Sequence, residues 1–127
     1  LPMHPRTRAR FDAWQLQHLV KPITLIPPLG FLVMVLLERR AALVVTDSGG
    51  VQKEAYLQGT PCVTVRTETE WVELMDSGWN RLANPADDVA ISMAMQHQLN
   101  MDVSRPRPPL YGDGHAAEAI VARLQQL

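Results

Sequence analysis

The strongest constraint in this sequence is a short apolar run that ends in two glycines and leads into a segment of helical composition. Residues 43–45 are apolar and β-rich, as in a buried strand, and Gly49 and Gly50 follow after Asp-Ser. Glycine lets backbone N–H groups approach an anion without a Cβ in the way, and a helix that starts here adds the positive end of its dipole. The run therefore predicts a strand, a turn and a helix. At their junction we expect either an anion site or a turn capped by Asp47 or Ser48.

Length, charge and cysteine content exclude several classes of protein. A chain of 127 residues, 46% apolar and 20% charged, is long enough for one ordinary core, so we expect a single domain over residues 1–127. The net charge of −1 gives no preference for nucleic acid or an anionic membrane, and we expect neither as a partner. The longest apolar run, residues 31–37, is far shorter than the roughly 20 residues of a bilayer span. A single cysteine, Cys62, cannot form an internal disulfide, which fits a cytoplasmic location.

Strand-like and helix-like segments alternate along the chain. We expect strands at residues 23–26, 43–45, 62–65 and 80–83, and helices at residues 5–19, 29–40, 49–57, 68–77 and 86–98. A last helix should follow a cap at Asp113, with a core stripe of Ala117, Ile120, Val121 and Leu124. Three prolines make residues 102–109 a loop. This alternation predicts an α/β fold of parallel βαβ units, in which ligands bind beyond the carboxyl ends of the strands.

Two residues outside the glycine turn suit a nucleotide. Glu54 lies four residues after Gly50, about one helical turn on, so its carboxylate can reach a ribose while the helix start holds phosphates. A solvated helix glutamate is the alternative. His4 precedes Arg6 and Arg8, and histidine with arginine suits phosphate contacts, although a solvated helix start also explains this pattern. The histidines and the cysteine show no metal-ligand spacing, so we expect no metal.

A polar segment follows the strand expected at residues 62–65. It contains Arg66, Thr69 and Glu70, with Trp71 next to them. Acidic residues suit the first turn of a helix, which explains much of this segment without a ligand. In the functional interpretation, Arg66 lies at the same sheet rim as the glycine turn. Thr69 and Glu70 then form a polar collar around a sugar, and Trp71 offers an apolar face.

Six segments are more specific together than any one of them alone. They are His-Pro-Arg-Thr-Arg at 4–8, Pro-Leu-Gly-Phe-Leu at 28–32, Thr-Asp-Ser-Gly-Gly-Val-Gln-Lys-Glu-Ala at 46–55, Gly-Thr-Pro at 59–61, Arg-Thr-Glu-Thr-Glu-Trp-Val-Glu at 66–73 and Tyr-Gly-Asp-Gly at 111–114. In these segments the chain closely resembles the non-hydrolysing UDP-N-acetylglucosamine 2-epimerases. The resemblance covers nearly the whole chain, and the six segments occur in the same order as in the family.

This resemblance implies a fold and a nucleotide site. The fold is of the glycosyltransferase-B type, in which two Rossmann-like domains, each a parallel sheet with helices on both faces, face each other across a cleft. The chain matches the C-terminal domain only, so the N-terminal domain is missing from it. In the family this domain holds the diphosphate of UDP with a Ser-Gly-Gly turn, here Ser48, Gly49 and Gly50. It holds the ribose with a glutamate, here Glu54.

The resemblance also assigns residues from the first part of the chain. Phe31 to Met34 would lie by the uracil, and His4 matches a histidine near the nucleotide cleft, where the family can also place a second, regulatory UDP-sugar. Family members are usually dimers, which leaves a homodimer open as a partner beside the UDP-sugar. No cofactor is implied.

The family reaction converts UDP-N-acetylglucosamine to UDP-N-acetylmannosamine by eliminating UDP and adding it back with C2 inverted. Its acid and base candidates are carboxylates of the N-terminal domain and a histidine in a Gly-His-Arg-Arg-Glu type motif, and the 127 residues contain no match to them. Proton abstraction needs a positioned base within hydrogen-bond reach. We therefore expect the chain by itself to be inactive.

Three alternatives remain open on the sequence alone. Many family members have Thr-Glu-Arg-Pro-Glu where this chain has Thr-Glu-Trp-Val-Glu at residues 69–73. Residues 52–56 and 70–73 are instead similar to the subgroup that acts on UDP-2,3-diacetamido-uronates, so the first alternative is a sugar of that class as the substrate. The other two alternatives are a non-catalytic UDP-sugar binding module and one half of a glycosyltransferase with the same fold.

Overall fold

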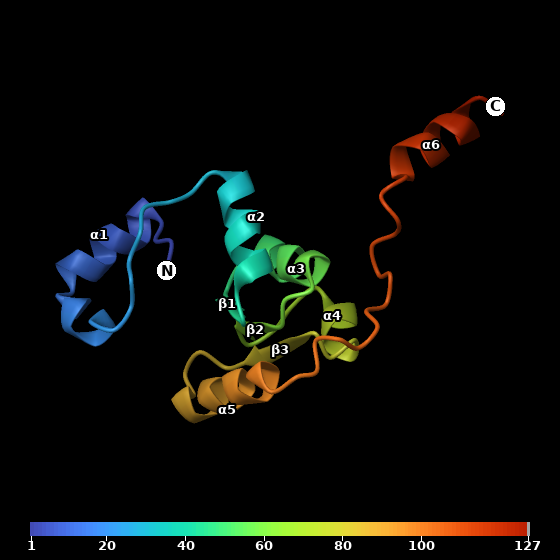
Figure 1. The fold of residues 1–127 in the computed structure, drawn as a ribbon. Coiled ribbons are helices and arrows are strands. Elements are labelled where there is room, and N and C mark those ends of the chain that lie inside the picture. Colours follow the sequence, from blue (N-terminus) through green and yellow to red (C-terminus); the bar gives the residue numbers. More distant parts are fainter. Residues whose placement is uncertain (127) are drawn as a thin grey trace. The chain divides into compact units, whose positions relative to one another are not determined.

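A computed structural model describes residues 1–126 of the chain (Figure 1). Its packing divides between Leu37 and Glu38 into a small N-terminal unit and a larger unit. The N-terminal unit contains α1 (Pro5–Ala13), the 3₁₀ helix η1 (Leu16–Val20) and the start of α2 (Phe31–Arg40). The larger unit contains the end of α2, β1 (Val44–Thr46), α3 (Gly49–Gln58), β2 (Cys62–Val65), α4 (Val72–Asp76), β3 (Asn80–Ala83), α5 (Asp88–Leu99) and α6 (Ala116–Leu124). The single domain expected over residues 1–127 stays a prediction.

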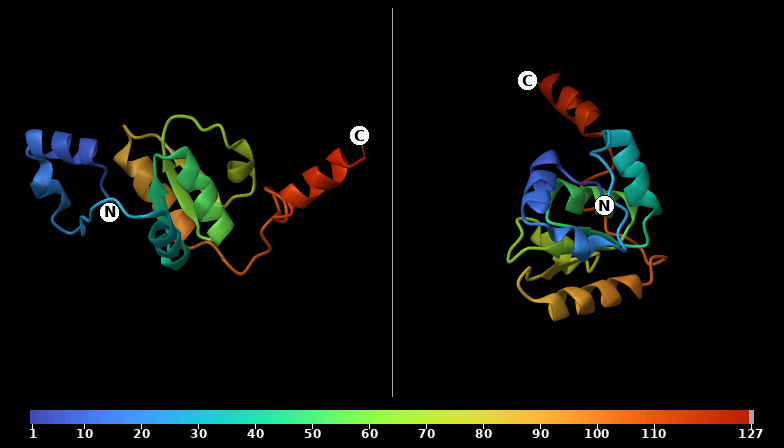
Figure 2. Two further views of the ribbon diagram at one scale, coloured as in Figure 1. Left: turned by 90° about the horizontal axis from the view of Figure 1, so that it is seen from above. Right: turned by 90° about the vertical axis from the view of Figure 1, so that its left-hand side faces the viewer.

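The strands of the larger unit form one parallel sheet in the order β1-β2-β3. Val44 pairs with Cys62, and Cys62 pairs in turn with Asn80, so each crossover advances the chain by one strand in the same direction. The two crossover helices, α3 and α4, lie on one face of the sheet, and α5 covers the other face (Figures 1 and 2). The predicted α/β fold with helices on both faces is confirmed. The carboxyl ends of β1 and β2, at Thr46 and Val65, therefore lie at the same edge.

A small apolar core lies on both faces of this sheet. Val63, at the centre of β2, is fully buried and packs with Ala83 and with Ala94 of α5. Its neighbour Cys62 packs with Ala55 of α3 on the opposite face, because successive strand side chains alternate in direction. A strand that is buried on both sides explains why the sequence of β2 is a continuous apolar and β-branched run.

The loop predicted at residues 102–109 is confirmed, and two arginines hold it against the ends of two helices. Arg105 donates to the backbone oxygen of Ser77, just after α4, at 2.8 Å. Arg107 donates to the backbone oxygen of Tyr56 in the last turn of α3. The loop therefore covers the carboxyl-terminal ends of both crossover helices.

Two predictions for the N-terminal unit need correction. The helix expected at residues 5–19 ends at Ala13, because Gln15 takes left-handed backbone angles (φ 53°) and the chain continues as the 3₁₀ helix η1. The strand expected at residues 23–26 is reduced to one parallel bridge between Pro2 and Ile26. Prolines on both sides of this segment remove backbone donors, which limits how far a ladder can extend.

Two predictions for the larger unit also need correction. The helix expected at residues 68–77 is shorter, since α4 begins at Val72 and the residues before it follow an irregular path. The last helix has His115 at its N-cap, whereas Asp113, two residues before it, accepts the N–H of His115 at 3.0 Å. None of the residues of α6 is buried, so its expected core stripe is exposed. Helical spacing defines an apolar face, but it does not supply the surface that covers that face.

The remaining predicted elements agree with the structure to within about two residues at each end. The glycine expected to terminate α3, Gly59, has the left-handed angles of a helix C-cap (φ 74°). No helix among residues 1–126 is both long and apolar enough to cross a lipid bilayer.

Candidate functional site

The centre of the candidate site is the turn where β1 ends and α3 begins. The N–H of Ser48 donates to Thr46 Oγ1 at 3.0 Å, and Ser48 itself is the N-cap of α3, with extended backbone angles. Its hydroxyl makes no capping hydrogen bond. Within residues 1–126, the N–H groups of Gly49, Gly50 and Val51 donate to no acceptor. Free N–H groups at the positive end of a ten-residue helix favour an anion site over a turn capped by a side chain.

The two glycines of this turn have different surroundings. A Cβ on Gly49 would lie 2.7 Å from Glu70 Oε1 and 3.4 Å from Trp71 Nε1. At Gly50 a Cβ would meet only Ser48 Oγ, at 3.9 Å. Gly49 therefore permits the close approach of the segment before α4, whereas Gly50 faces open space from which a ligand can reach the backbone.

A buried polar network holds the segment before α4 against α3. Gln52 of α3 is fully buried, and its Oε1 accepts hydrogen bonds from Thr69 Oγ1 at 2.8 Å and from Asn80 Nδ2 at 3.2 Å. Asn80 also bonds to the buried Thr64 of β2. The N–H of Trp71 donates to Thr69 Oγ1 at 3.2 Å. The network ties α3, β2 and β3 to this segment and so positions Trp71 beside the start of α3.

Arg66 and Glu70 form an ion pair next to the glycine turn. Arg66 Nη1 lies 3.1 Å from Glu70 Oε2, and both side chains are partly exposed. The pKa of Glu70 lies below its ordinary value because its own backbone N–H donates to the carboxylate and because Arg66 and Lys53 are nearby. Glu70 is therefore an anion, stabilised where a phosphate would also be attracted.

Lys53 lies between two aromatic rings on the same side of α3. Its Nζ is 3.2 Å from the centroid of the Trp71 ring and 4.8 Å from that of Tyr111, both within the range of cation–π attraction. Tyr111 donates its hydroxyl to Glu73 Oε1 at 2.8 Å. The backbone N–H of Glu73 and this contact lower the pKa of Glu73, whereas burial and Glu73 raise the pKa of Tyr111. Lys53 and Trp71 thus form one wall beside the glycine turn.

Glu54 has a buried carboxylate as its neighbour. It lies one turn of α3 beyond Gly50 and is half-buried. Glu38, near the end of α2, is 2% exposed, and neither of its carboxylate oxygens meets a hydrogen-bond donor within residues 1–126. Burial, and then the negative charge of Glu54, raise the pKa of Glu38 to about 7.

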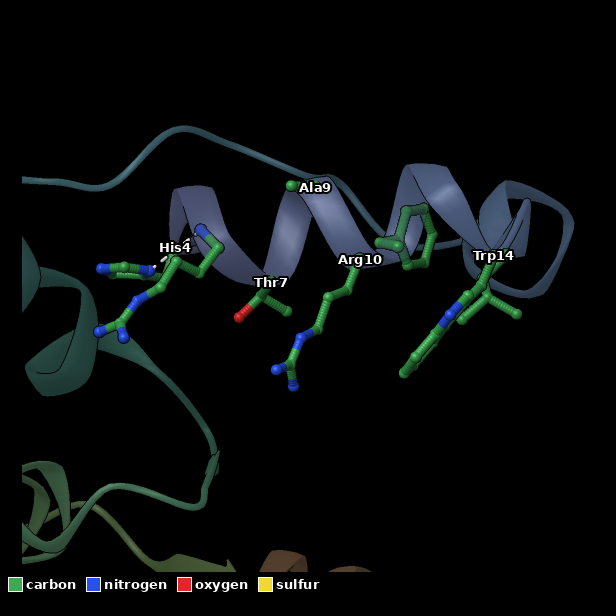
Figure 3. Close-up of a pocket in the computed structure, with 8 residues that line it drawn as sticks. His4, Thr7, Ala9, Arg10 and Trp14 are labelled. Atoms are coloured by element: carbon green, nitrogen blue, oxygen red, sulfur yellow. Dashed lines mark hydrogen bonds between the residues drawn. The ribbon is translucent and has the colours of Figure 1, made fainter.

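The N-terminal unit contains His4, which is the N-cap of α1. Its Nδ1 accepts the N–H of Arg6 at 3.2 Å, so one ring nitrogen already has a structural role. Thr7, Arg10 and Trp14 point to one side of α1 and, with His4, border an open hollow of about 720 Å³ (Figure 3). This unit therefore carries a basic and aromatic helix face.

The other expected residues of that unit lie on α2. Phe31, its first residue, is 67% exposed, and Met34 is half-buried one turn later. Exposure leaves the Phe31 ring free to contact a planar ligand.

The larger unit brings most of the expected site residues to one region and adds others. The expected residues on α3 and the segment before α4 are Ser48, Gly49, Gly50, Glu54, Arg66, Thr69 and Glu70. Sequence reasoning assigned no contacts to Gln52, Lys53 or Glu38. The sequence carries no local signal for the burial of Glu38, because that burial depends on residues from distant segments of the chain. Within residues 1–126 no three metal-ligating side chains gather.

The sequence matches the model of one protein family, described as UDP-N-acetylglucosamine 2-epimerase, over residues 1–125. Among curated proteins, the chain is 43% identical to UDP-2,3-diacetamido-2,3-dideoxy-D-glucuronate 2-epimerase of Pseudomonas aeruginosa, over all of this chain and 34% of that protein. It is 38% identical to a UDP-N-acetylglucosamine 2-epimerase homolog of Methanococcus maripaludis, over 99% of this chain and 35% of that protein.

A solved structure of a UDP-GlcNAc 2-epimerase is also similar to this chain. The crystal structure of Methanocaldococcus jannaschii UDP-GlcNAc 2-epimerase in complex with UDP-GlcNAc and UDP superposes with a TM-score of 0.84 at 35% identity. The match covers 99% of this chain and 35% of that one, so the chain spans about a third of the length of the relatives it matches. The parallel sheet with helices on both faces is therefore part of a glycosyltransferase-B type fold. The chain belongs to the UDP-N-acetylglucosamine 2-epimerase family.

Proposed function

We propose that this chain is the UDP-binding part of a UDP-N-acetylglucosamine 2-epimerase. The observation that carries the proposal is the start of α3. Three N–H groups without an acceptor among residues 1–126 follow Ser48 there, and a half-buried Glu54 lies one turn further along. A diphosphate suits the N–H groups and the helix dipole, and a ribose diol suits a carboxylate at that spacing. Support also comes from the relative in the M. jannaschii structure, which holds UDP-GlcNAc and UDP.

The other residues of the site take roles around the same nucleotide. Thr69 and Glu70 contact the sugar, and Arg66 contacts the diphosphate when it exchanges Glu70 for phosphate oxygens. Phe31 and Met34 contact the uracil. His4 contributes at the nucleotide cleft or at a second UDP-sugar site, through the ring nitrogen that does not cap α1.

The proposed reaction is an isomerisation that needs no cofactor. UDP leaves C1 while a base takes the proton from C2, and UDP then returns with C2 inverted. This chain stabilises the leaving group, because N–H groups at a helix start are most effective where negative charge develops. The groups that move the C2 proton are supplied by another part of the enzyme. The family match favours this epimerase role over a glycosyltransferase half.

Calorimetric titration with UDP tests the proposal. We expect the 127-residue chain to bind UDP, and Glu54→Ala to weaken binding by about tenfold or more, because a hydrogen bond to a charged acceptor contributes about 1.5–3 kcal/mol. The control is Glu118→Ala on α6, whose side chain is 71% exposed and which should bind as the wild type does. A folded sample without affinity for UDP, or a Glu54→Ala variant with wild-type affinity, would contradict the proposal.

A second candidate substrate is a UDP-2,3-diacetamido-uronate. The Pseudomonas aeruginosa relative, which is 43% identical, is named for such a sugar. The two segments that resemble its subgroup touch each other through Lys53 and the ring of Trp71. Displacement of UDP by each nucleotide sugar ranks the candidates, and tighter binding of the uronate would favour it over UDP-N-acetylglucosamine.

Several further expectations belong to this proposal. They are a cytoplasmic location, a homodimer, and a missing N-terminal domain that completes the cleft. The relatives are about three times as long as the match, which supports the last of these.

A further inference from the structure

Glu38 is a buried acid for which the proposed function has no role. It is 2% exposed, on the last turns of α2. Its backbone oxygen accepts the hydroxyl of Thr60 at 2.8 Å, and Ala41 beyond it packs against the cluster that contains Ala55 of α3. These contacts hold the end of α2 against α3 and keep the Glu38 carboxyl out of water.

Within residues 1–126, no positive charge compensates Glu38. The titratable groups that face it are Glu54 from α3 and Cys62 from β2. Burial raises the pKa of the Cys62 thiol to about 12, so Cys62 is neutral. Arg39 and Arg40, which follow Glu38 on α2, are exposed, and neither forms an ion pair with it in the part of the chain that the structure describes.

Two carboxylates without a cation between them retain a proton. If both were ionised, neither would offer the other a hydrogen-bond donor, and the buried oxygens of Glu38 would stay without a partner. A proton on Glu38 removes one charge and supplies the missing donor. Because Glu38 is the more buried of the two, the proton belongs on Glu38.

We propose that Glu38 is a positioning residue for the nucleotide, a protonated carboxylic acid that donates to Glu54 and holds the Glu54 carboxylate in place for the ribose hydroxyls. This inference rests on the proposed function, because it takes Glu54 as the ribose ligand. Glu38 acts through Glu54 and does not touch the nucleotide.

The consequence is a pH-dependent affinity for the nucleoside part of the ligand. With a pKa of about 7, Glu38 keeps its proton at about pH 6 and loses it at about pH 8.5. The second negative charge then repels Glu54 and removes the donor that held it. We expect UDP affinity to fall by on the order of tenfold across this range, beyond any change due to the diphosphate itself.

The test compares the wild-type chain with Glu38→Gln and Glu38→Leu, using calorimetric titration with UDP and with inorganic pyrophosphate between about pH 6 and about pH 8.5. Gln keeps an N–H donor and cannot ionise, so it should bind UDP at every pH as the wild type does at about pH 6. Leu keeps the volume without a donor, so it should bind UDP about tenfold more weakly even at about pH 6. Pyrophosphate lacks the ribose, and its affinity should be the same in all three proteins at each pH.

The outcomes separate this inference from the proposed function. UDP binding with the same pH dependence in the wild type and in Glu38→Gln would overturn the role of Glu38 alone. That role is also overturned if Glu38→Leu lowers pyrophosphate affinity as much as UDP affinity, because the defect is then structural. Absence of UDP binding by the folded wild type at every pH would overturn the proposed function, and the role of Glu38 with it.

Discussion

Among single residues, Glu38 differs most from what its type leads one to expect. A glutamate followed by two arginines at the end of a helix is ordinarily solvated. Here, packing of α2 against α3 leaves Glu38 2% exposed, beside Glu54 and without a donor among residues 1–126. Glu54, which is half-buried, keeps access to solvent and to a ligand. The same residue type thus provides a buried acid and a candidate ribose ligand, and only burial distinguishes the two.

This environment predicts how the stability of the chain depends on pH. On folding, the pKa of Glu38 rises from 4.5 to about 7, so the folded chain binds this proton more tightly than the unfolded chain. The resulting stabilisation is complete below about pH 4.5 and is lost as the pH rises to about 7. The free energy of unfolding should fall by up to about 3 kcal/mol over this window from Glu38 alone.

Urea unfolding at about pH 4.5 and about pH 8 measures this effect as a difference between proteins. Glu38→Gln cannot lose a proton, so it should be more stable than the wild type at about pH 8 and similar to it at about pH 4.5. The difference in stability between the two proteins isolates the contribution of Glu38 from that of exposed carboxylates such as Asp12 and Glu73. The pKa values of these two are lowered in the folded chain, so their contribution to stability has the opposite pH dependence. Equal stability of the two proteins at both values would show that Glu38 does not carry a proton in the folded chain.

At the level of secondary-structure elements, α3 and α4 end in the same way. Each is followed by a glycine with left-handed angles, Gly59 (φ 74°) and Gly78 (φ 73°). An arginine of the loop after α5 lies against each glycine, with Arg107 Nη1 2.9 Å and Arg105 Nη2 3.0 Å from where a Cβ would be. These arginines donate to carbonyls at the two helix ends, and the Tyr56 oxygen also accepts the N–H of Gly59. The caps and the loop therefore depend on each other.

Gly59→Ala should consequently destabilise the larger unit. Left-handed angles cost a residue with a Cβ about 1–2 kcal/mol, and displacement of Arg107 adds to this cost. Gly50→Ala, in the first turn of the same helix and with open space around it, should change the free energy of unfolding by less than about 1 kcal/mol. Chemical denaturation of both variants compares them, and equal effects would mean that the conformation at Gly59 does not matter.

At the scale of the whole molecule, the proposed reaction has two separate requirements, a nucleotide-binding site and a site that transfers the C2 proton. The chain covers 34% of the Pseudomonas aeruginosa relative, and in the proposed function the residues gathered around α3 bind and orient the nucleotide, with no evident base for C2 among residues 1–126. His4 caps α1, Glu54 is assigned to the ribose, and Glu70 is paired with Arg66. The proposed reaction therefore requires a base that is not found among these residues.

We accordingly expect no turnover by the 127-residue chain alone. Incubation with UDP-N-acetylglucosamine should yield no UDP-N-acetylmannosamine above a protein-free background, even at concentrations where UDP binds. Gly49→Ala provides a control for trace activity, because it should weaken binding at the turn. Product formation by the wild type that this variant abolishes would show that the chain supplies its own acid and base.

Much of the fold could be predicted from the sequence because its signals are local. The apolar run of β2, the glycine at the start of α3 and Gly59 at its end each act through neighbouring backbone geometry. Predictions from local pattern failed where a backbone conformation or a tertiary hydrogen bond acted against that pattern. A left-handed Gln15 ended α1 early, and a hydrogen bond from Thr69 to the buried Gln52 held the residues before α4 out of a helix.

The sequence by itself determined the strand–turn–helix unit and the spacing from Gly50 to Glu54, because one helical turn fixes that distance whatever surrounds it. Only the tertiary structure decided which residues lie beside that unit. Burial of Glu38 next to Glu54, and of Gln52 beneath Thr69, depends on helices and strands that meet from distant parts of the chain. Burial and pairwise charge act through space, so no local pattern in the chain encodes them.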